Sequence, residues 1–221
     1  MMANKKISKK RIIAGAVAAV GTVAAGSFLW LKASYVLPFH VPAYRADRVI
    51  DGDTFVTTEE QDIRLDSVNA PEKGRCGYEE ATEELKKLVM NKPLYIKVVF
   101  HDKFRRLVAQ VYSPDGNVNE IMISKGLAYI ESGASSQALG PATDQAREKK
   151  LGIFSDKCTQ TVNKSQPKCD IKGNDRNGKI YYLPSCGVYP NVTVQLYLGD
   201  QWFCTEKEAI KAGFRKPVQC P

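Results

Sequence analysis

Two short segments carry oxygen ligands within 22 residues of each other: Asp51-Gly52-Asp53-Thr54 and Asn69-Ala70-Pro71-Glu72. Asp53, an oxygen of Asn69 and a nearby backbone carbonyl could hold a hard cation such as Ca²⁺, because Ca²⁺ prefers oxygen ligands. Asp51, taken alone, is better explained as a residue of the tight turn at Gly52. The two segments therefore predict a metal site around Asp53.

Three further side chains would add hydrolytic chemistry to such a site. Glu72, stiffened by Pro71 before it, is a candidate general base for a water molecule. Arg64 and Arg106 could fork onto phosphate oxygens and stabilise the charge that builds at phosphorus. Each residue singly could be a solvated loop acid or a surface arginine, but the set suits attack of water on a phosphodiester.

Histidine chemistry is a poor alternative, because the chain contains only His40 and His101. Neither belongs to a Ser-His-Asp arrangement or to a zinc-peptidase pattern, so a histidine-based nuclease or peptidase is not expected. Composition excludes other classes: with 43% hydrophobic and 25% charged residues, the chain is neither wholly disordered nor a multi-span membrane protein.

The elements that would position these residues form a strand-first pattern. A hairpin is expected over 45–58, a half-buried strand over 62–68, and β-rich runs over 93–100 and 107–112. Helices are predicted over 79–90, 119–125 and 143–150. Strands with interspersed helices indicate an α+β fold, a small β-barrel with helices packed on it.

The order of five motifs resembles the staphylococcal nuclease (thermonuclease) family: VIDGDTF, IRLDSVNAPE, HDKFRRLVAQVY, VNEIMISKGLA and AREKKLGIF. The resemblance covers about residues 46–155, roughly half of the chain. It implies a five-stranded OB-type barrel with three helices and a Ca²⁺-dependent phosphodiesterase that cuts DNA and RNA.

The resemblance also implies a metal site. Asp53 matches the family's metal-binding aspartate, and Ala70 would supply its backbone carbonyl. Asn69 stands where a second metal carboxylate usually lies, so this chain departs from the pattern by one negative charge. We expect weaker Ca²⁺ binding, or binding only with substrate present.

Catalytic and substrate-binding roles follow in the same way. Glu72 matches the catalytic glutamate, and Arg64 and Arg106 match the two catalytic arginines. Lys103 and Phe104 match residues that border the nucleotide pocket. The family prototype's two stacking tyrosines are replaced by the run 129–133, YIESG, so substrate preference cannot be carried over.

The N-terminus predicts export. Five basic residues within 5–11 precede 20 residues, 12–31, without any charge, which is long enough for a membrane-spanning helix. Residues 1–34 are thus expected to be an uncleaved transmembrane anchor with its N-terminus inside, or a signal peptide cleaved before Gly26. The protein would be extracytoplasmic, either membrane-anchored or secreted.

Charge supports this division. The chain has a net charge of +8, and residues 1–34 contribute six basic residues and no acids. The remaining body therefore carries a net charge of +2, which excludes a histone-like or ribosomal binder. Any nucleic-acid contact must come from a local cluster of basic residues.

Six cysteines fit an oxidising compartment, and no two are closely spaced as in most zinc sites. They are predicted to form disulfides, Cys76 with Cys158 and two bonds among the last four, a zinc site in the tail being the alternative. The first pairing is also the one seen in secreted members of the family that the chain resembles. The cysteines are Cys76, Cys158, Cys169, Cys186, Cys204 and Cys220.

These patterns predict five regions: 1–34, a linker 35–44, the nuclease-like domain 45–158, a polar linker 159–168, and a small cysteine-rich module 169–221. Thr205 and Glu208 form a capping box that should begin a short helix in the module. The tail resembles a small module found behind some bacterial secreted nucleases. Its aromatic residues, among them Tyr181 and Trp202, suit a core better than a base-stacking surface.

The sequence thus predicts an extracytoplasmic Ca²⁺-dependent nuclease. Its partners would be DNA or RNA as substrate and the membrane through the N-terminal helix, with no protein partner implied. One alternative is an OB-type module that binds nucleic acid with little or no catalysis. Another is a structural envelope protein displayed by the anchor, which would need neither catalytic arginine.

Overall fold

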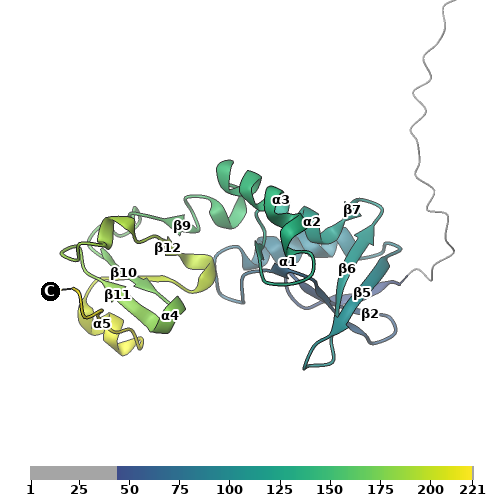
Figure 1. Ribbon diagram of the computed structural model, residues 1–221, viewed down its shortest axis with the longest axis horizontal. Coiled ribbons are helices and arrows are strands. Elements are labelled where there is room, and N and C mark those ends of the chain that lie inside the picture. Colours follow the sequence, from purple (N-terminus) through teal and green to yellow (C-terminus); the bar gives the residue numbers. More distant parts are fainter. Residues whose placement is uncertain (1–43, 221) are drawn as a thin grey trace, which may run out of the picture. The chain divides into compact units, whose positions relative to one another are not determined.

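The main sheet brings together the strands that were expected to carry the chemistry. In the computed structural model, which describes residues 44–220, its strand order is β1-β2-β3-β6-β5, with β7 paired to β6 (Figure 1). β3 and β6 run parallel, with Arg64 opposite Val108, and the other pairs are antiparallel. The bounds are β1 Ala46–Val49, β2 Thr54–Thr57, β3 Asp62–Leu65, β5 Tyr95–His101, β6 Leu107–Ser113 and β7 Gly116–Asn117.

The α+β class is confirmed, but a closed five-stranded barrel is not. Among the described residues, the two edges of the sheet meet only through isolated bridges, Tyr44 with Leu94 and Ala46 with Met90. Tyr44 and Leu94 exchange two backbone hydrogen bonds of 2.9 Å. The sheet also has six strands, because the turn at residues 114–115 returns as β7 beside β6.

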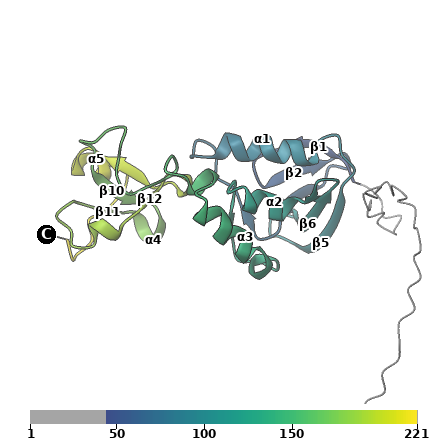
Figure 2. The same ribbon diagram turned by 90° about the horizontal axis from the view of Figure 1, so that it is seen from above.

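Three helices pack on this sheet, as predicted: α1 Tyr78–Val89, α2 Val118–Ser124 and α3 Ser136–Glu148. Figure 2 shows α1 beside β1. The buried Asn119 ties α2 to the sheet, because its side chain accepts from Val111 N at 2.9 Å and donates to Asp66 O and Ala109 O. A large apolar core lies between these elements.

The prediction for α3 was wrong at its start. A helix was expected only over residues 143–150, and Gly140 and Pro141, which precede it, disfavour a helix interior. The observed helix begins at Ser136 and contains Pro141. Leu139, Thr143 and Ala146 are buried at helical spacing, so packing of this face offsets the poor local propensity.

A short antiparallel pair borders the candidate site. β4, Val68–Asn69, pairs with β8, Tyr129–Ile130, so that Asn69 lies opposite Tyr129. Hydrogen bonds also tie the segment after β8 to the residues just before β4. Ser135 N donates to Asp66 Oδ2 at 2.9 Å and to Ser67 Oγ at 3.0 Å.

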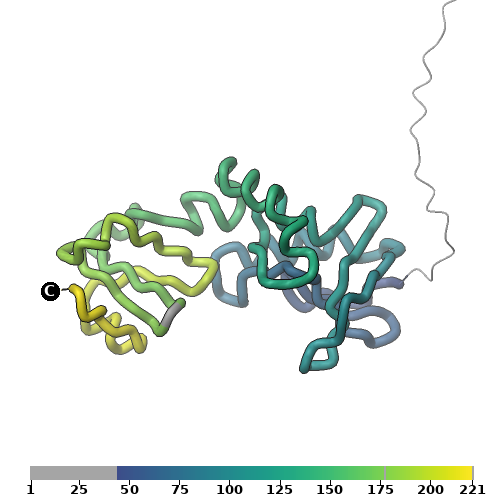
Figure 3. Tube along the Cα trace, viewed as in Figure 1, coloured from purple at the N-terminus to yellow at the C-terminus, as the bar shows by residue number. Residues whose placement is uncertain are grey.

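The C-terminal module has its own sheets and short helices, and Figure 3 traces its path in green to yellow. One sheet has the order β11-β10-β13, and a second pair joins β12 to β9, so the predicted linker 159–168 begins with a strand. The bounds are η1 Gly152–Phe154, β9 Thr159–Gln160, β10 Ile171–Asn174, α4 Arg176–Lys179, β11 Ile180–Tyr182, η2 Tyr189–Asn191, β12 Val194–Gln195, η3 Leu196–Leu198, β13 Gln201–Phe203 and α5 Glu206–Lys211.

All six cysteines form disulfides, which confirms that prediction: Cys76–Cys158, Cys169–Cys204 and Cys186–Cys220. The tail cysteines are therefore not available as zinc ligands. The module needs these bonds, since its apolar core is a small cluster that includes Tyr181, Phe203 and Phe214. Tyr181 is thus a core residue rather than a base-stacking one.

The capping box of the module forms largely as predicted. Thr205 is the N-cap of α5, and its side chain accepts from Glu208 N at 3.2 Å. The Glu208 carboxylate reaches back to Cys204 N at 2.9 Å, one residue before the cap itself. The helix start therefore also fixes the backbone at a disulfide.

Tyr197 joins the module to the nuclease part. It is buried in a cluster with Ala146, Ile153, Phe154 and Cys158, and Leu196 N donates to Cys158 O at 2.8 Å. The described residues, 44–220, accordingly belong to one compact unit.

The predicted anchor or signal segment 1–34 and most of the linker 35–44 lie outside the described residues. Within residues 44–220, no helix has both the length and the apolar character that a membrane crossing requires.

Candidate active site

The buried carboxylate of Asp53 lies at the centre of the candidate site, in the turn between β1 and β2. It is 6% exposed. Its Oδ1 accepts from Thr54 Oγ1 at 2.9 Å, and its Oδ2 accepts from Ala70 N at 2.7 Å. The second contact spans 17 residues and holds the Asn69-Ala70 peptide against Asp53. The two predicted metal-binding segments therefore meet.

The turn itself requires glycine at position 52. A Cβ built there would lie 2.5 Å from Ala81 Cβ of α1 and 2.6 Å from Ala70 Cβ. Gly52 thus lets the turn approach both the helix and the second segment, which brings Asp53 to its place. Asp51 Oδ1 accepts from Asp53 N at 3.0 Å, as expected for a turn aspartate.

The carboxyl group of Asp51 also interacts electrostatically with Asp53. Burial, together with the neighbouring negative charge of Asp53, raises its pKa to about 6. Two carboxylates side by side are a locally negative environment that a cation would relieve. The alternative that Asp51 serves only the turn is therefore incomplete.

Arg64 projects from β3 into this environment. Its Nη1 forms an ion pair with Asp53, and its Nη2 donates to Glu131 Oε2 at 3.0 Å. Arg64 Nη1 is buried, and its partner among residues 44–220 is the Asp53 carboxylate. The two carboxylates hold the guanidinium between them, and a phosphate oxygen is a group of the same charge that could replace one of them.

The position of Arg64 follows from the sheet register. Thr54 pairs with Arg64 across β2 and β3, so the arginine starts directly beside the residue after Asp53. Ile63 and Leu65, on either side, are buried in the core. Alternation along β3 therefore directs Arg64 to the opposite face, as the sequence predicted.

Glu72 lies in the loop after Ala70 and is exposed. Its backbone carbonyl accepts from Arg75 N at 2.9 Å, which makes a turn directly after it. Disulfide Cys76–Cys158 ties the end of this loop to the chain beyond η1. The backbone around Glu72 is thus fixed at both ends, while its carboxylate faces solvent, where water is available.

Arg106 immediately precedes β6, the parallel neighbour of β3. Asp102 Oδ2 accepts from Arg106 Nε at 2.7 Å and thereby orients the guanidinium. Lys103 and Phe104 lie in the same loop, and Phe104 is 66% exposed. Lys103 Nζ and Arg106 Cζ lie 5.0 and 5.4 Å from the centre of the Phe104 ring, so the loop presents one aromatic ring with two cations.

The structure thus joins Asp53, Arg64 and Ala70 by direct contacts, with Asn69 next to Ala70. Glu72 and Arg106 lie on the adjoining loops, and their side chains make no hydrogen bond or ion pair with Asp53 or Arg64 within residues 44–220. Within those residues no cluster of three or more His, Cys, Asp or Glu side chains could bind a metal alone. A cation here would need Asn69 and backbone oxygens.

The donor chemistry of the site fits Ca²⁺ but offers few charges. Asp53, the amide oxygen of Asn69 and the carbonyl of Ala70 are hard oxygen ligands, and Ca²⁺ takes six to eight of these, including waters. A single fully buried carboxylate is a low charge for such a site. Water or substrate oxygens would have to complete it.

Glu131 was missed as a site residue by sequence reasoning. It follows β8, and its carboxylate pairs with Arg64 at 3.0 Å although 67 residues separate the two. Its only sequence signal was its position in the run that replaces the prototype's tyrosines. Gly133 is needed next to it, because a Cβ there would lie 2.4 Å from Ser67 Oγ.

A buried Asp–Arg pair, with an exposed acid and a second arginine on adjoining loops, is the set of groups that phosphodiester cleavage would use. Comparison with known proteins gives the family. The model of the family described as "Staphylococcal nuclease homologue" matches residues 62–156. The chain is 34% identical over 117 residues to a protein of Escherichia coli O157:H7 named "Uncharacterized endonuclease", covering 51% of this chain and 76% of that protein.

Two further relatives agree. "Micrococcal nuclease" of Shigella flexneri is 29% identical over 151 residues, 57% of this chain and 84% of that protein. "Staphylococcal-like nuclease CAN1" of Arabidopsis thaliana is 33% identical over 93 residues, 42% of this chain and 29% of that protein. The chain belongs to the staphylococcal nuclease family and is a hydrolase of the nuclease type.

Proposed function

We propose that this protein is an extracytoplasmic, Ca²⁺-dependent nuclease that hydrolyses phosphodiester bonds of DNA, RNA or both. The observation that carries the proposal is the Arg64 guanidinium, which two carboxylates, Asp53 and Glu131, hold beside residue 70. A phosphate oxygen is an acceptor of the right charge and shape for it. The nuclease names of the relatives support the same substrate class.

Asp53, the Asn69 side chain and the Ala70 carbonyl would hold Ca²⁺. When bound, the ion would neutralise charge on a phosphate oxygen. Arg64 is already beside Asp53. When Ca²⁺ and the substrate bind, its guanidinium would leave the Asp53 carboxylate and bind the phosphate. The loss of one family carboxylate at Asn69 predicts that the ion binds more tightly with substrate than alone.

Glu72 would take the proton from a water molecule as its oxygen forms a bond to phosphorus. The bond from phosphorus to the leaving oxygen breaks, and that oxygen takes up a proton from solvent. Arg64 and Arg106 would stabilise the charge on the phosphoryl oxygens while the first bond forms and the second breaks. Asp102 supports this role, because its hydrogen bond to Nε leaves the far end of Arg106 available for phosphate.

The compartment is argued from chemistry. Three disulfides join all six cysteines, and such bonds persist in oxidising compartments. The uncharged run 12–31 after five basic residues supports export, as an anchor or as a cleaved signal. A membrane partner through this segment is part of the proposal.

The test is cleavage of a fluorescent single-stranded DNA by the oxidised full-length protein, in mild detergent, with Ca²⁺ titrated against chelator. We expect turnover that rises with Ca²⁺ and stops with chelator. Absence of turnover at millimolar Ca²⁺, with the protein folded, would refute the proposal.

A second candidate function is nucleic-acid binding without turnover. It is favoured by one observation: Arg64 contacts both Asp53 and Glu131, so two carboxylates already neutralise its charge. Anisotropy of a labelled oligonucleotide in the same samples would distinguish the two. Tight binding at every Ca²⁺ level without product would support the binding module.

A further inference from the structure

A pocket of about 530 Å³ adjoins the candidate active site and is lined by three arginines, Arg75, Arg147 and Arg176, referred to below as the arginine cleft. Asp175 is the one acidic residue in its lining. The lining therefore carries a net charge of +2, as much as the whole of residues 35–221. The arginine cleft is therefore a local cluster of basic residues in a part of the chain, residues 35–221, whose overall net charge is low.

The three arginines come from both parts of the chain. Arg75 lies in the loop after Glu72, Arg147 on α3, and Arg176 at the start of α4 in the module. Within residues 44–220, neither Arg147 nor Arg176 has an ion pair with a carboxylate, and Arg75 has only a long one, 3.8 Å, with Asp175. Three like charges gathered with one counter-charge, Asp175, favour an anionic ligand.

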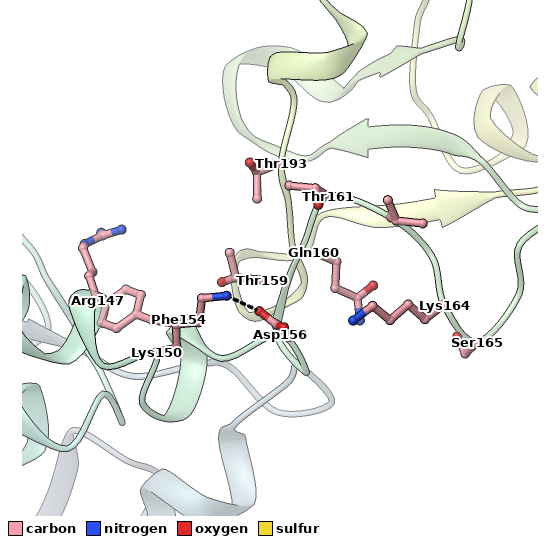
Figure 4. Close-up of a pocket in the computed structure, with 11 residues that line it drawn as sticks. Arg147, Lys150, Phe154, Asp156, Thr159, Gln160, Thr161, Lys164, Ser165 and Thr193 are labelled. Atoms are coloured by element: carbon pink, nitrogen blue, oxygen red, sulfur yellow. Dashed lines mark hydrogen bonds and ion pairs between the residues drawn. The ribbon is translucent and has the colours of Figure 1, made fainter.

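The guanidiniums are held rather than free to move apart. Arg176 Nη2 donates to Gln195 Oε1 at 2.8 Å, and the Arg147 guanidinium lies 4.3 Å from the centre of the Phe154 ring. Figure 4, a close-up of the neighbouring pocket, shows Arg147 reaching past Phe154 and away from the Lys150–Asp156 pair. Packing on an aromatic ring orients a guanidinium and leaves its N–H groups for a ligand.

A neutral donor of the cleft also lacks a partner. Thr143 lines the same pocket and is 8% exposed, and its buried hydroxyl has no hydrogen bond within residues 44–220. Buried hydroxyls normally have partners, so this unpaired hydroxyl is an unusual feature of the wall of the cleft. Tyr197 also lines the cleft. Burial raises the pKa of its hydroxyl, and the positive charges of Arg147 and Arg176 act in the opposite direction.

The cleft continues from the catalytic residues. Tyr129 and Ile130 line it, and these residues of β8 pair with Asn69 and Val68 of β4. The next residue, Glu131, contacts Arg64. A strand that leaves the scissile phosphate at Arg64 would therefore pass along β8 into the arginine cleft.

We propose that the arginine cleft binds the phosphodiester backbone of the nucleic-acid strand beyond the cleavage site, so that the C-terminal module is part of the substrate-binding surface. This inference rests on the proposed function for the identity of the ligand. Arg147 and Arg176 contact backbone phosphates, which fixes the strand without reading its sequence.

The experiment measures binding of labelled single-stranded DNA to the full-length oxidised protein by anisotropy, in chelator, over a series of salt concentrations. The oligonucleotides have about 16 and about 4 nucleotides, the range of strand lengths that OB-type folds cover. The test variant is Arg147→Gln/Arg176→Gln. The matched control is Lys207→Gln/Lys211→Gln, which removes the same charge from exposed positions on α5.

For the longer strand, the test variant should bind about tenfold more weakly, and its salt slope should fall by about 1.4, or about 0.7 for each lost phosphate contact. The control should change neither quantity by a comparable amount. Arg147→Lys/Arg176→Lys, which keeps the charges, should retain the slope and thereby exclude misfolding. Equal binding and slope in the test variant and the control, or no binding of either strand to the wild type, would overturn the inference.

The proposed nuclease activity is tested separately from strand binding by the arginine cleft. Ca²⁺ added to the same wild-type samples tests turnover, which the binding series in chelator does not require. A cleft-dependent salt slope without turnover would remove the nuclease and keep the cleft. Turnover in the wild type, with an unchanged salt slope in Arg147→Gln/Arg176→Gln, would support the nuclease and overturn the role of the arginine cleft.

Discussion

Glu131→Gln should strengthen substrate binding. The Glu131 carboxylate lies 3.0 Å from Arg64 Nη2, where a substrate phosphate would bind the same guanidinium. The carboxylate and the phosphate therefore compete for Arg64. Gln keeps the shape of the side chain and removes its charge. The backbone bond from Glu131 N to Ser67 O, 3.1 Å, does not depend on the side chain, so the loop should keep its position.

The magnitude follows from the exposure of the pair. Two unit charges at this distance in water attract by about 1.4 kcal/mol. The Glu131 side chain is 54% exposed, so salt and side-chain entropy reduce the value to about 0.7 kcal/mol. This corresponds to a KM about threefold lower, with kcat changed little, because the competing contact is made in the ground state.

Steady-state cleavage of single-stranded DNA at saturating Ca²⁺ measures both constants. The matched control is Glu120→Gln, which removes an exposed acid on α2 that has no ion pair within residues 44–220. Its KM should change much less, since only long-range charge is altered. A KM for Glu131→Gln that is unchanged or higher would refute the competition and assign Glu131 to positioning Arg64.

Three further changes test other parts of the site and fold. Asn69→Asp should lower the half-saturating Ca²⁺ concentration about tenfold or more in the cleavage assay, because a carboxylate joins Asp53 at the predicted metal site. Gly52→Ala should lower the free energy of unfolding by about 1–3 kcal/mol in urea titrations, because its Cβ would lie 2.5 Å from Ala81 Cβ. The pKa of Tyr181 is raised to about 12 by burial and by its bond to Glu206, so stability should fall between about pH 10 and 12.

The sign of the last effect is fixed by proton linkage. In the folded protein Tyr181 keeps its proton up to a higher pH than in the unfolded chain, so its contribution is complete below about pH 10 and is lost as pH rises through about 12. Tyr181→Phe should remove this part of the pH dependence, measured by urea unfolding. An identical pH profile would contradict the assignment, as would an unchanged Ca²⁺ requirement for Asn69→Asp, or an unchanged urea midpoint for Gly52→Ala.

Much of the fold was predictable because local pattern and core packing agree. Alternation around Arg64 gave its face correctly, and the turn at Gly52 was read from its neighbours. The capping box at Thr205 set the start of α5. These features depend on neighbours within a few residues, and such neighbours are visible in a sequence.

Other features depend on contacts that no local pattern records. The start of α3 at Ser136 is decided by burial of its apolar face against the core, despite Gly140 and Pro141. The Glu131–Arg64 pair joins residues 67 positions apart. The arginine cleft assembles side chains from three distant elements, each of which reads singly as a solvated arginine. Such sets appear only when the chain is folded.

The roles assigned to Glu72 and Arg106 are tested most directly by one rate. Cleavage of single-stranded DNA at saturating Ca²⁺ is compared for the wild type, Glu72→Gln/Arg106→Ala and the control Glu79→Gln, an exposed acid of α1. Loss of the base and of one phosphate-binding arginine should each cost about 100-fold or more in rate. The account predicts that the double variant loses essentially all turnover and that the control keeps it. Retained turnover in the double variant would contradict it.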